Sequence, residues 1–260
     1  MTNVFDQIAE STGAFTRESV SQLGAISRFF FRVMCALPAT LARFHLIMEQ
    51  MMILGVRTIP IVLLTSAFVG LVSAWQVKYL FSDVMPLTVL GAAVGKAVFT
   101  ELGPVLTALV ITGRIGARLA AELGTMRVTE QIDAMTCLSL DPYCYLLAPR
   151  MVAGAIMVPI LTIFSAFFAI ISAQLLAQFA MGLYPATFYN GLKMLFRVQD
   201  VVICLVKAFV FGVSISLSGC YFGFLTTGGA VGVGESTKKA VVFGMVLIMV
   251  SNLIVVNVLL

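Results

Sequence analysis

Residues Glu101–Arg150 have the sequence ELGPVLTALVITGRIGARLAAELGTMRVTEQIDAMTCLSLDPYCYLLAPR, and the rest of the chain can be interpreted around them. The segment begins inside an apolar run that carries an acid, Glu101. It continues through small residues into a charged, amphipathic hairpin, and the next apolar run starts at Pro149-Arg150. Two membrane spans do not need a connection of this length and mixed charge. The segment therefore predicts a membrane helix followed by a docking element.

The composition places the chain in a membrane. Of its 260 residues, 60% are hydrophobic and 11% are charged, whereas soluble domains are roughly 25% charged. A spanning helix needs about 20 apolar residues, so about five or six spans fit. The net charge of +4 does not indicate a nucleic-acid partner. We expect an all-α, polytopic integral membrane protein.

The apolar runs predict two regions. Residues 1–50 hold a polar tail and an amphipathic helix from about Arg17 to Leu41, with Arg28 and Arg32 opposite its apolar residues. This pattern is typical of a helix in the membrane surface, although a soluble amphipathic helix would share it. Residues 51–260 form the transmembrane domain, with a cytoplasmic coupling hairpin at 119–149. Its five predicted spans are about 51–81, 86–112, 151–181, 201–222 and 241–260.

Basic residues predict the orientation, because cytoplasmic loops carry an excess of Lys and Arg. With a cytoplasmic N-terminus and five spans, the bases fall mostly on that side, and the C-terminus is periplasmic. The cytoplasmic bases are then Arg17, Arg28, Arg32, Arg43, Arg57, Arg114, Arg118, Arg127, Arg150, Lys238 and Lys239. The far side keeps Lys78, Lys193 and Arg197. A glycine-rich stretch at 226–234 is expected to be a cytoplasmic loop.

Three ionisable residues fall inside predicted spans, where charges are costly and usually functional. Lys96 precedes Glu101 by five residues, about 7 Å along a helix. Lys207 lies in the predicted span 201–222, seven residues after Asp200. The three residues would suit an outer-half cavity for an amphiphile with an anionic headgroup. A Glu–Lys pair that only stabilises helix packing is the alternative.

The hairpin offers a candidate docking surface. Residues 126–135 alternate apolar and charged side chains, and Asp141-Pro142 is a good helix start. A short helix with exposed acids suits insertion into a groove on a soluble partner. A surface loop that caps the bundle explains the composition about equally well.

No catalytic or metal site is indicated. The five cysteines lack metal-binding spacing, and His45 is the single histidine. Gly229–Ser236 approaches a phosphate-binding loop, but Glu235 takes the place of the lysine and would repel phosphate. We expect no enzymatic activity, cofactor or metal on this chain.

The motifs in order resemble a known family. Residues 101–104 (ELGP), 113–116 (GRIG), 121–126 (AELGTM) and 129–134 (TEQIDA) are followed by Asp141-Pro142 and 148–150 (APR). Together they are similar to the signature of MlaE (YrbE-like) permeases of lipid-transporting ABC systems. The later GGAxGVG at 228–234, with Thr237 and 240–242 (AVV), resembles that family's second motif. The resemblance covers about residues 50–260.

The resemblance implies a homodimer in the cell inner membrane, each protomer having an interfacial helix and five spans. The sequence leaves the host open between a double-membraned bacterium and a plastid, and the missing transit-peptide pattern favours the bacterium. A cytoplasmic ABC ATPase (MlaF-like) dimer, which binds ATP and Mg²⁺, would bind the hairpin. A periplasmic MCE-domain (MlaD-like) hexamer and a small STAS-like accessory protein would complete the complex. The cargo would be phospholipid moved between inner and outer membranes.

The resemblance also assigns residues. The lipid cavity would be lined by Glu101, Lys207, Lys96 and Thr100, with Thr100 where some members have arginine and Lys96 supplying charge. Glu235 stands where many members have a base. The ATPase-coupling residues would be Glu122, Met126, Arg127, Thr129, Glu130, Gln131 and Asp133.

Two other classes compete. An ion-coupled secondary transporter of an anionic amphiphile would use Glu101 and Lys207 without an ATPase, and it predicts inverted repeats, which the sequence lacks. A membrane scaffold that transports nothing leaves the intramembrane charges unexplained.

Overall fold

The computed structural model describes residues 2–81 and 89–259, with side chains at 17, 21–22, 24–80 and 89–259. Every regular element in these ranges is a helix. Six stretches of the described chain are long and apolar enough to cross a membrane: Gly24–Leu41, Phe44–Leu80, Leu90–Val128, Tyr143–Met181, Val198–Phe224 and Gly229–Leu259. The prediction of an all-α polytopic membrane protein is confirmed.

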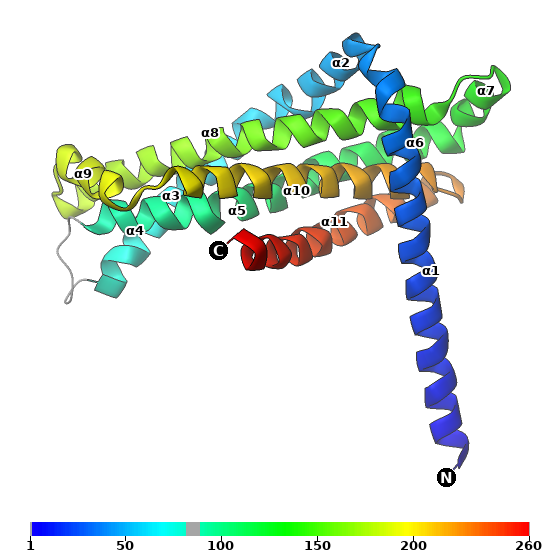
Figure 1. The fold of residues 1–260 in the computed structure, drawn as a ribbon, viewed down its shortest axis with the longest axis horizontal. Helices are drawn as coiled ribbons and strands as arrows, with labels where there is room; N and C mark the ends of the chain where they lie inside the picture. The colour runs from blue at the N-terminus through cyan, green and yellow to red at the C-terminus, as the bar shows by residue number, and fades with distance from the viewer. Residues whose placement is uncertain (1, 82–88, 260) are drawn as a thin grey trace.

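Five of these stretches form rods that lie side by side along one direction (Figure 1). The first joins α2 (Phe44–Leu54), η1 (Val56–Thr58) and α3 (Ile59–Phe81). The second runs through α4 (Leu90–Ala97), η3 (Val98–Leu102), α5 (Gly103–Ile111), η4 (Thr112–Gly116) and α6 (Ala117–Val128). The third joins η5 (Tyr143–Leu147) to α8 (Ala148–Met181), and the last two are α10 (Val198–Phe224) and α11 (Gly229–Leu259). The short helices α7 (Gln131–Cys137) and α9 (Pro185–Leu195) lie at opposite ends of this bundle (Figure 1).

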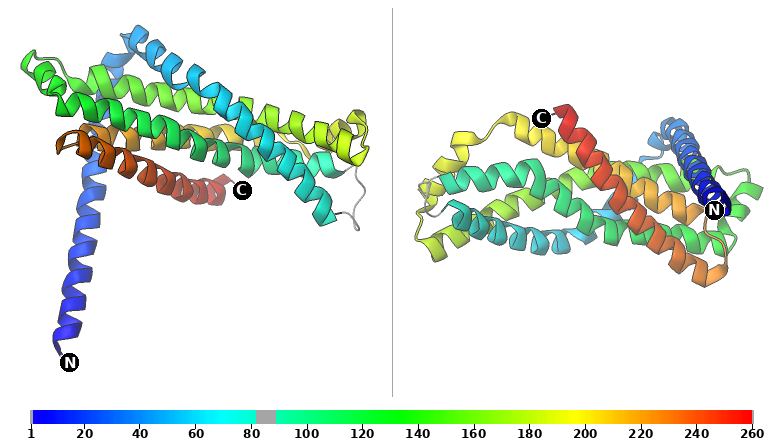
Figure 2. Two further views of the ribbon diagram at one scale, coloured as in Figure 1. Left: turned by 180° about the vertical axis from the view of Figure 1, so that it is seen from behind. Right: turned by 90° about the horizontal axis from the view of Figure 1, so that it is seen from below.

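The remaining helix, α1 (Thr2–Leu41), runs across the end of the bundle that carries α7 (Figures 1 and 2). Phe29, Val33 and Ala36 are buried, whereas Arg28 and Arg32 are exposed. Its C-terminal part, Gly24–Leu41, is apolar enough to span, but its direction across the rods agrees with the predicted interfacial helix. Five rods and one crossing helix therefore make up the described fold.

Two helices extend further than the sequence predicted. The second rod runs without a break from Leu90 to Val128, so residues 119–128 of the predicted hairpin belong to it; predicted residues 86–88 lie outside the described part. The last helix starts at Gly229, not at 241, so only the first residues of the predicted glycine loop are non-helical. Positive φ angles of 85° at Gly228 and 68° at Gly229 make the turn before it. Glycine is favoured at such angles because it has no Cβ.

Small residues allow α6 and α10 to pack closely, as the spacing of Gly116, Ala120 and Gly124 at intervals of four residues predicted. A Cβ added to Gly219 of α10 would lie 3.1 Å from the Gly116 carbonyl oxygen and 2.9 Å from the Leu119 Cβ. A Cβ on Gly223 would lie 3.0 Å from the Ala120 Cα. The close backbone approach fixes the rotation of α10, and with it the direction of Lys207.

Candidate functional site

Lys207 of α10 is fully buried and is held by two oxygens of the second rod. Its Nζ donates to Glu101 Oε1 over 2.5 Å and to the Thr100 carbonyl oxygen over 2.8 Å. A buried charge is strongly disfavoured unless it is paired and hydrogen-bonded. The structure thus contains a Glu–Lys pair of the kind that the sequence predicted as the alternative to a lipid cavity.

The backbone around Glu101 explains the second of these bonds. Pro104 has no N–H, so in a regular helix the Thr100 carbonyl, four residues earlier, would lack its donor. Residues Val98–Leu102 form a π-helical turn, which is frequent at functional sites. The Thr100 hydroxyl donates to the Lys96 carbonyl over 2.8 Å, so Thr100 reaches Lys207 by its backbone alone. The sequence Thr-Glu-Leu-Gly-Pro thus supplies both acceptors for Lys207.

A third residue, Asn252 of α11, completes the cluster and was not among the predicted site residues. Its Nδ2 donates to Glu101 Oε2 over 3.2 Å, while its Oδ1 is buried with no hydrogen-bond partner among the described residues. Asn252 is a polar residue inside the charge-free run 241–260, and this could have marked it in the sequence. Three helices therefore meet at one carboxylate.

The cluster is closed around Lys207 and open at Glu101. The Lys207 side chain is 0% exposed, whereas the Glu101 side chain is 42% exposed. The part of α11 beyond it is largely exposed, as Leu253, Ile254 and Val258 show. A molecule that approached this cluster would therefore meet the Glu101 carboxylate first, with Lys207 behind it.

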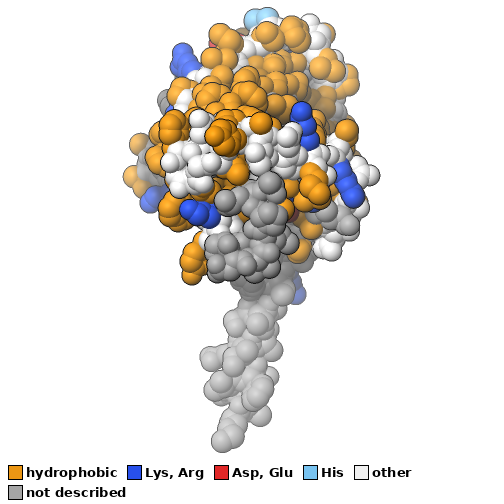
Figure 3. Space-filling view, turned by 90° about the vertical axis from the view of Figure 1, so that its left-hand side faces the viewer, with side chains coloured by type: hydrophobic (Ala, Val, Ile, Leu, Met, Phe, Trp, Pro, Cys, Tyr) orange, Lys and Arg blue, Asp and Glu red, His pale blue; other side chains and the backbone are white. Residues whose placement is uncertain are grey.

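Lys96 does not join this cluster. Its Nζ lies 3.6 Å from Asp200 Oδ1 at the start of α10, and Asp200 Oδ2 also accepts the Arg197 backbone N–H over 3.2 Å. The Lys96 side chain is 44% exposed. Figure 3 views the α9 end of the bundle, where basic side chains lie singly among hydrophobic ones. The structure thus separates the predicted cavity residues into two ion-paired groups.

Most of the predicted coupling residues of the hairpin are exposed. Thr129, Glu130, Gln131 and Asp133 are exposed, and α7 is anchored by one buried side chain, Ile132. Glu130 has a φ of 58°, an uncommon left-handed conformation for a non-glycine residue, at the turn into α7. Such a largely exposed helix is free to contact another protein.

Other predicted hairpin residues hold its base together. Glu122 accepts from Arg118 Nε over 2.6 Å and lies 3.8 Å from Arg150 of α8, which is nearly buried. Arg127 is hydrogen-bonded to Asp133. Met126 is half-buried. Glu122 thus links α6 to α8, a role that the sequence pattern did not indicate.

The far side of the hairpin is capped as predicted and attached to α1. Asp141 accepts the Tyr143 backbone N–H over 3.0 Å, which confirms the predicted helix start at Asp141-Pro142. The Arg43 guanidinium lies 4.0 Å from the centre of the Tyr145 ring. Thr40 Oγ1 donates to the Cys144 carbonyl over 3.0 Å. The crossing helix and the hairpin exit therefore form one packed unit.

Comparisons with known proteins agree with this architecture. A family model described as Permease MlaE matches residues 47–258. A probable ABC transporter permease protein of Synechocystis sp. is 43% identical over 79% of this chain and 78% of its own length. One from Rickettsia conorii is 36% identical over 95% of this chain and 96% of its own. The chloroplast protein TRIGALACTOSYLDIACYLGLYCEROL 1 of Arabidopsis thaliana is 36% identical over 80% of this chain and 59% of its own.

Proposed function

The chain belongs to the MlaE permease family, and from that premise we propose that it forms the membrane path of an ABC transporter that moves phospholipid between the inner and outer membranes. The observation that carries the proposal is the Lys207–Glu101–Asn252 cluster. Ionisable residues inside the membrane are rare and commonly mark substrate or ion pathways. Here they meet in the second, fourth and fifth rods, and the carboxylate stays partly exposed.

Lipid as the cargo is supported by two observations. Glu101 and Lys207 offer an acid and a base to a charged headgroup, while the neighbouring face of α11 is apolar. The name of the chloroplast relative, TRIGALACTOSYLDIACYLGLYCEROL 1, refers to a diacylglycerol lipid. A phosphate group would bind Lys207 once Glu101 turned away from it. The cluster would then have two states: an empty one in which Lys207 pairs with Glu101, and a lipid-bound one in which Lys207 pairs with the phosphate.

The free energy for transport comes from a separate ATPase, which binds ATP and Mg²⁺, in this proposal. The exposed residues of α7 support docking of that ATPase, because a short helix with Ile132 as its buried side chain can insert into a groove on its partner. Closure of the ATPase dimer would pull on the hairpin around Glu130. The pull can shift the permease only as far as the ATPase binds one permease state better than the other.

The remaining partners follow from family membership. We propose a homodimer in the inner membrane with a cytoplasmic N-terminus and a periplasmic C-terminus. An MCE-domain hexamer would sit on the α9 end, and a small STAS-like protein would join the cytoplasmic assembly. The exposed apolar residues of α11, such as Val250 and Leu253, are available to a second copy or to lipid.

The test is extraction of the tagged full chain from its native membrane in mild detergent, followed by mass spectrometry of its proteins and lipids. An ATPase, an MCE-domain protein and bound phospholipid are expected. The lipid should be depleted in a Lys207→Glu variant, which repels phosphate, and retained in Lys193→Glu, a matched change at an exposed site. Recovery of the chain without an ATPase, under conditions that keep other ABC transporters whole, would instead favour an ion-coupled transporter.

A further inference from the structure

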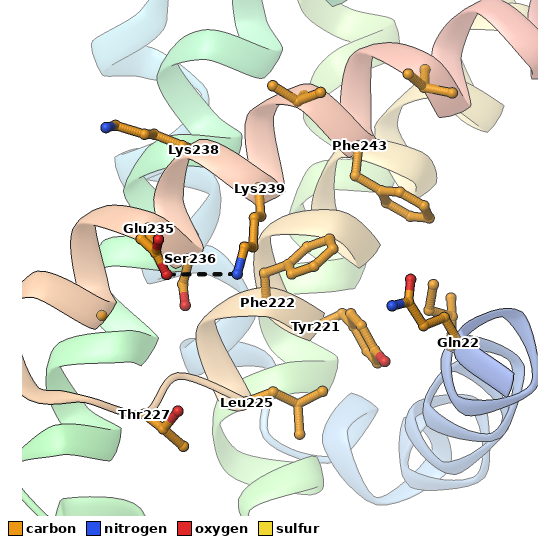
Figure 4. A pocket seen from close by; sticks show the side chains of 14 residues that line it. Gln22, Tyr221, Phe222, Leu225, Thr227, Glu235, Ser236, Lys238, Lys239 and Phe243 are labelled. Atoms are coloured by element: carbon orange, nitrogen blue, oxygen red, sulfur yellow. Dashed lines mark ion pairs between the residues drawn. The ribbon is translucent and has the colours of Figure 1, made fainter. Parts of the chain in front are cut away.

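A groove of about 720 Å³ lies between α1, α10 and α11 at the end of the bundle that carries the hairpin (Figure 4). Gln22 and Ile26 of α1 form one wall, and Tyr221 and Phe222 of α10 form the floor. The first five turns of α11, through residues 232–246, form the other wall. None of Glu101, Lys207 and Asn252 lines it, so this groove is separate from the intramembrane cluster.

The lining changes from polar to apolar along α11. Glu235, Ser236 and Lys239 lie near the helix start, whereas Phe243 and Val246 lie further along. Glu235 and Val246 are eleven residues apart, about 16 Å at 1.5 Å per residue. A polar mouth followed by an apolar channel of this length matches a lipid whose headgroup lies at the membrane surface. An apolar peptide would not need the polar mouth.

The charges at the mouth favour an anionic headgroup. Lys239 Nζ lies 3.7 Å from Glu235 Oε2, and both side chains are more than 60% exposed, at 62% and 67%. Exposed pairs of this kind contribute little, so the Glu235 carboxylate, which would repel phosphate, can turn into solvent and leave Lys239 to bind the phosphate. Lys238 extends along the surface from the same turn (Figure 4) and has no ion pair with a described residue.

A second pocket strengthens the positive field. It occupies about 270 Å³ next to the groove, shares Tyr221 and Leu225 with it, and adds Arg28 and Arg32. The charged residues that line the two pockets are thus four bases and one acid. Clusters of bases next to a membrane attract anionic lipids.

We propose that this groove binds an anionic phospholipid of the leaflet next to the hairpin, with the phosphate beside Lys239 and an acyl chain against Phe243 and Val246. The bound lipid joins the crossing helix α1 to α11. Binding requires only that the chain is in a membrane, so it stands or falls independently of the proposed transport.

The test uses the full chain in nanodiscs of phosphatidylcholine with a trace of photoactivatable phosphatidylglycerol, and cross-linked peptides are mapped by mass spectrometry. Cross-links are expected on residues 222–246. Labelling of a Lys238→Gln/Lys239→Gln variant should fall about 30-fold, since each of the two bases near the surface contributes on the order of 1 kcal/mol and every 1.4 kcal/mol is a factor of ten. The control Lys78→Gln/Lys193→Gln removes two bases outside the groove and should leave the labelling unchanged.

A second pair of variants tests the apolar channel. Val246→Trp fills it, whereas Val250→Trp places the same ring one turn further on; the two valines are 53% and 51% exposed. Only Val246→Trp should reduce the labelling. Equal labelling by a phosphatidylcholine probe, or no response to the lysine variant, would overturn the proposal in favour of unselective lipid contact. Disulfides between two copies of a Val242→Cys variant would also overturn the proposal, because a second chain would then cover the groove.

Discussion

Removing Glu101 is expected to destabilise the protein far more than removing its partner Lys207. In Glu101→Ala the ammonium of Lys207 stays fully buried and keeps one described acceptor, the Thr100 carbonyl. Breaking a buried ion pair from one side costs about 3–5 kcal/mol, because a buried charge is left uncompensated. We therefore expect Glu101→Ala to lower the free energy of unfolding by about 3 kcal/mol.

Lys207→Met should cost much less. The carboxylate left behind is 42% exposed and still accepts from Asn252, so solvent and one hydrogen bond compensate its charge. The methionine fills much of the volume of the lysine stem, so little cavity is left at the site. We expect a loss of about 1 kcal/mol, and a double variant Glu101→Ala/Lys207→Met that is more stable than Glu101→Ala alone.

The assay is equilibrium unfolding of the purified chain in mixed detergent micelles at increasing denaturing detergent, for the parent, both single variants and the double variant. The double-mutant cycle should give a coupling of about 2 kcal/mol between the two sites, above the roughly 0.5 kcal/mol seen for independent sites. Equal costs for the two single variants, with an additive double variant, would refute the argument that burial of Lys207 makes the pair asymmetric.

Three further changes test the hairpin, the helix packing and the third member of the cluster. Glu130→Lys, on an exposed turn, should abolish lipid-stimulated ATP turnover in the reconstituted complex while the unfolding curve stays unchanged; normal turnover in an intact complex would contradict the coupling role. Gly219→Val should destabilise the chain by about 1–3 kcal/mol in the same unfolding assay, because its Cβ would lie 2.9 Å from the Leu119 Cβ. Asn252→Leu removes one hydrogen bond to Glu101 and the unpaired Oδ1, so we expect a stability change below about 1.5 kcal/mol but a measurable loss of co-purified lipid; full lipid occupancy would separate Asn252 from the cargo site.

The sequence predicted those features that depend on one segment at a time. The lengths of the apolar runs predicted the long helices, and Arg28 and Arg32 marked the exposed face of α1. The Asp141-Pro142 pair gave a helix start that the structure confirms. The spacing of Gly116 and Ala120 gave the small-residue face on which α10 packs. Each of these signals is local, so no knowledge of the rest of the fold was needed.

Features that depend on two segments were partly missed. Lys96 could be placed at a depth in the membrane, but its pairing with Asp200 depends on how α4 and α10 are rotated about their axes. Asn252 reaches Glu101 for the same reason. Helix ends were also displaced: continuous helix through η4 lengthened the second rod, and Gly232 and Gly234 lie within α11 despite their weak helix propensity.

The attachment of α1 to the hairpin exit connects the proposed ATPase-docking hairpin to the proposed lipid groove. Phe29 of α1 packs against Tyr143 of η5, with ring centres 5.8 Å apart, and against Phe224 at the end of α10, at 6.0 Å. Packed aromatic groups move together more readily than they separate, because separation exposes their buried area. An ATPase that displaced η5 would therefore also displace α1, which lines the proposed lipid groove through Gln22 and Ile26. By reciprocity, an anionic lipid that holds α1 against α11 must change the affinity of the hairpin for its partner, and by the same free energy.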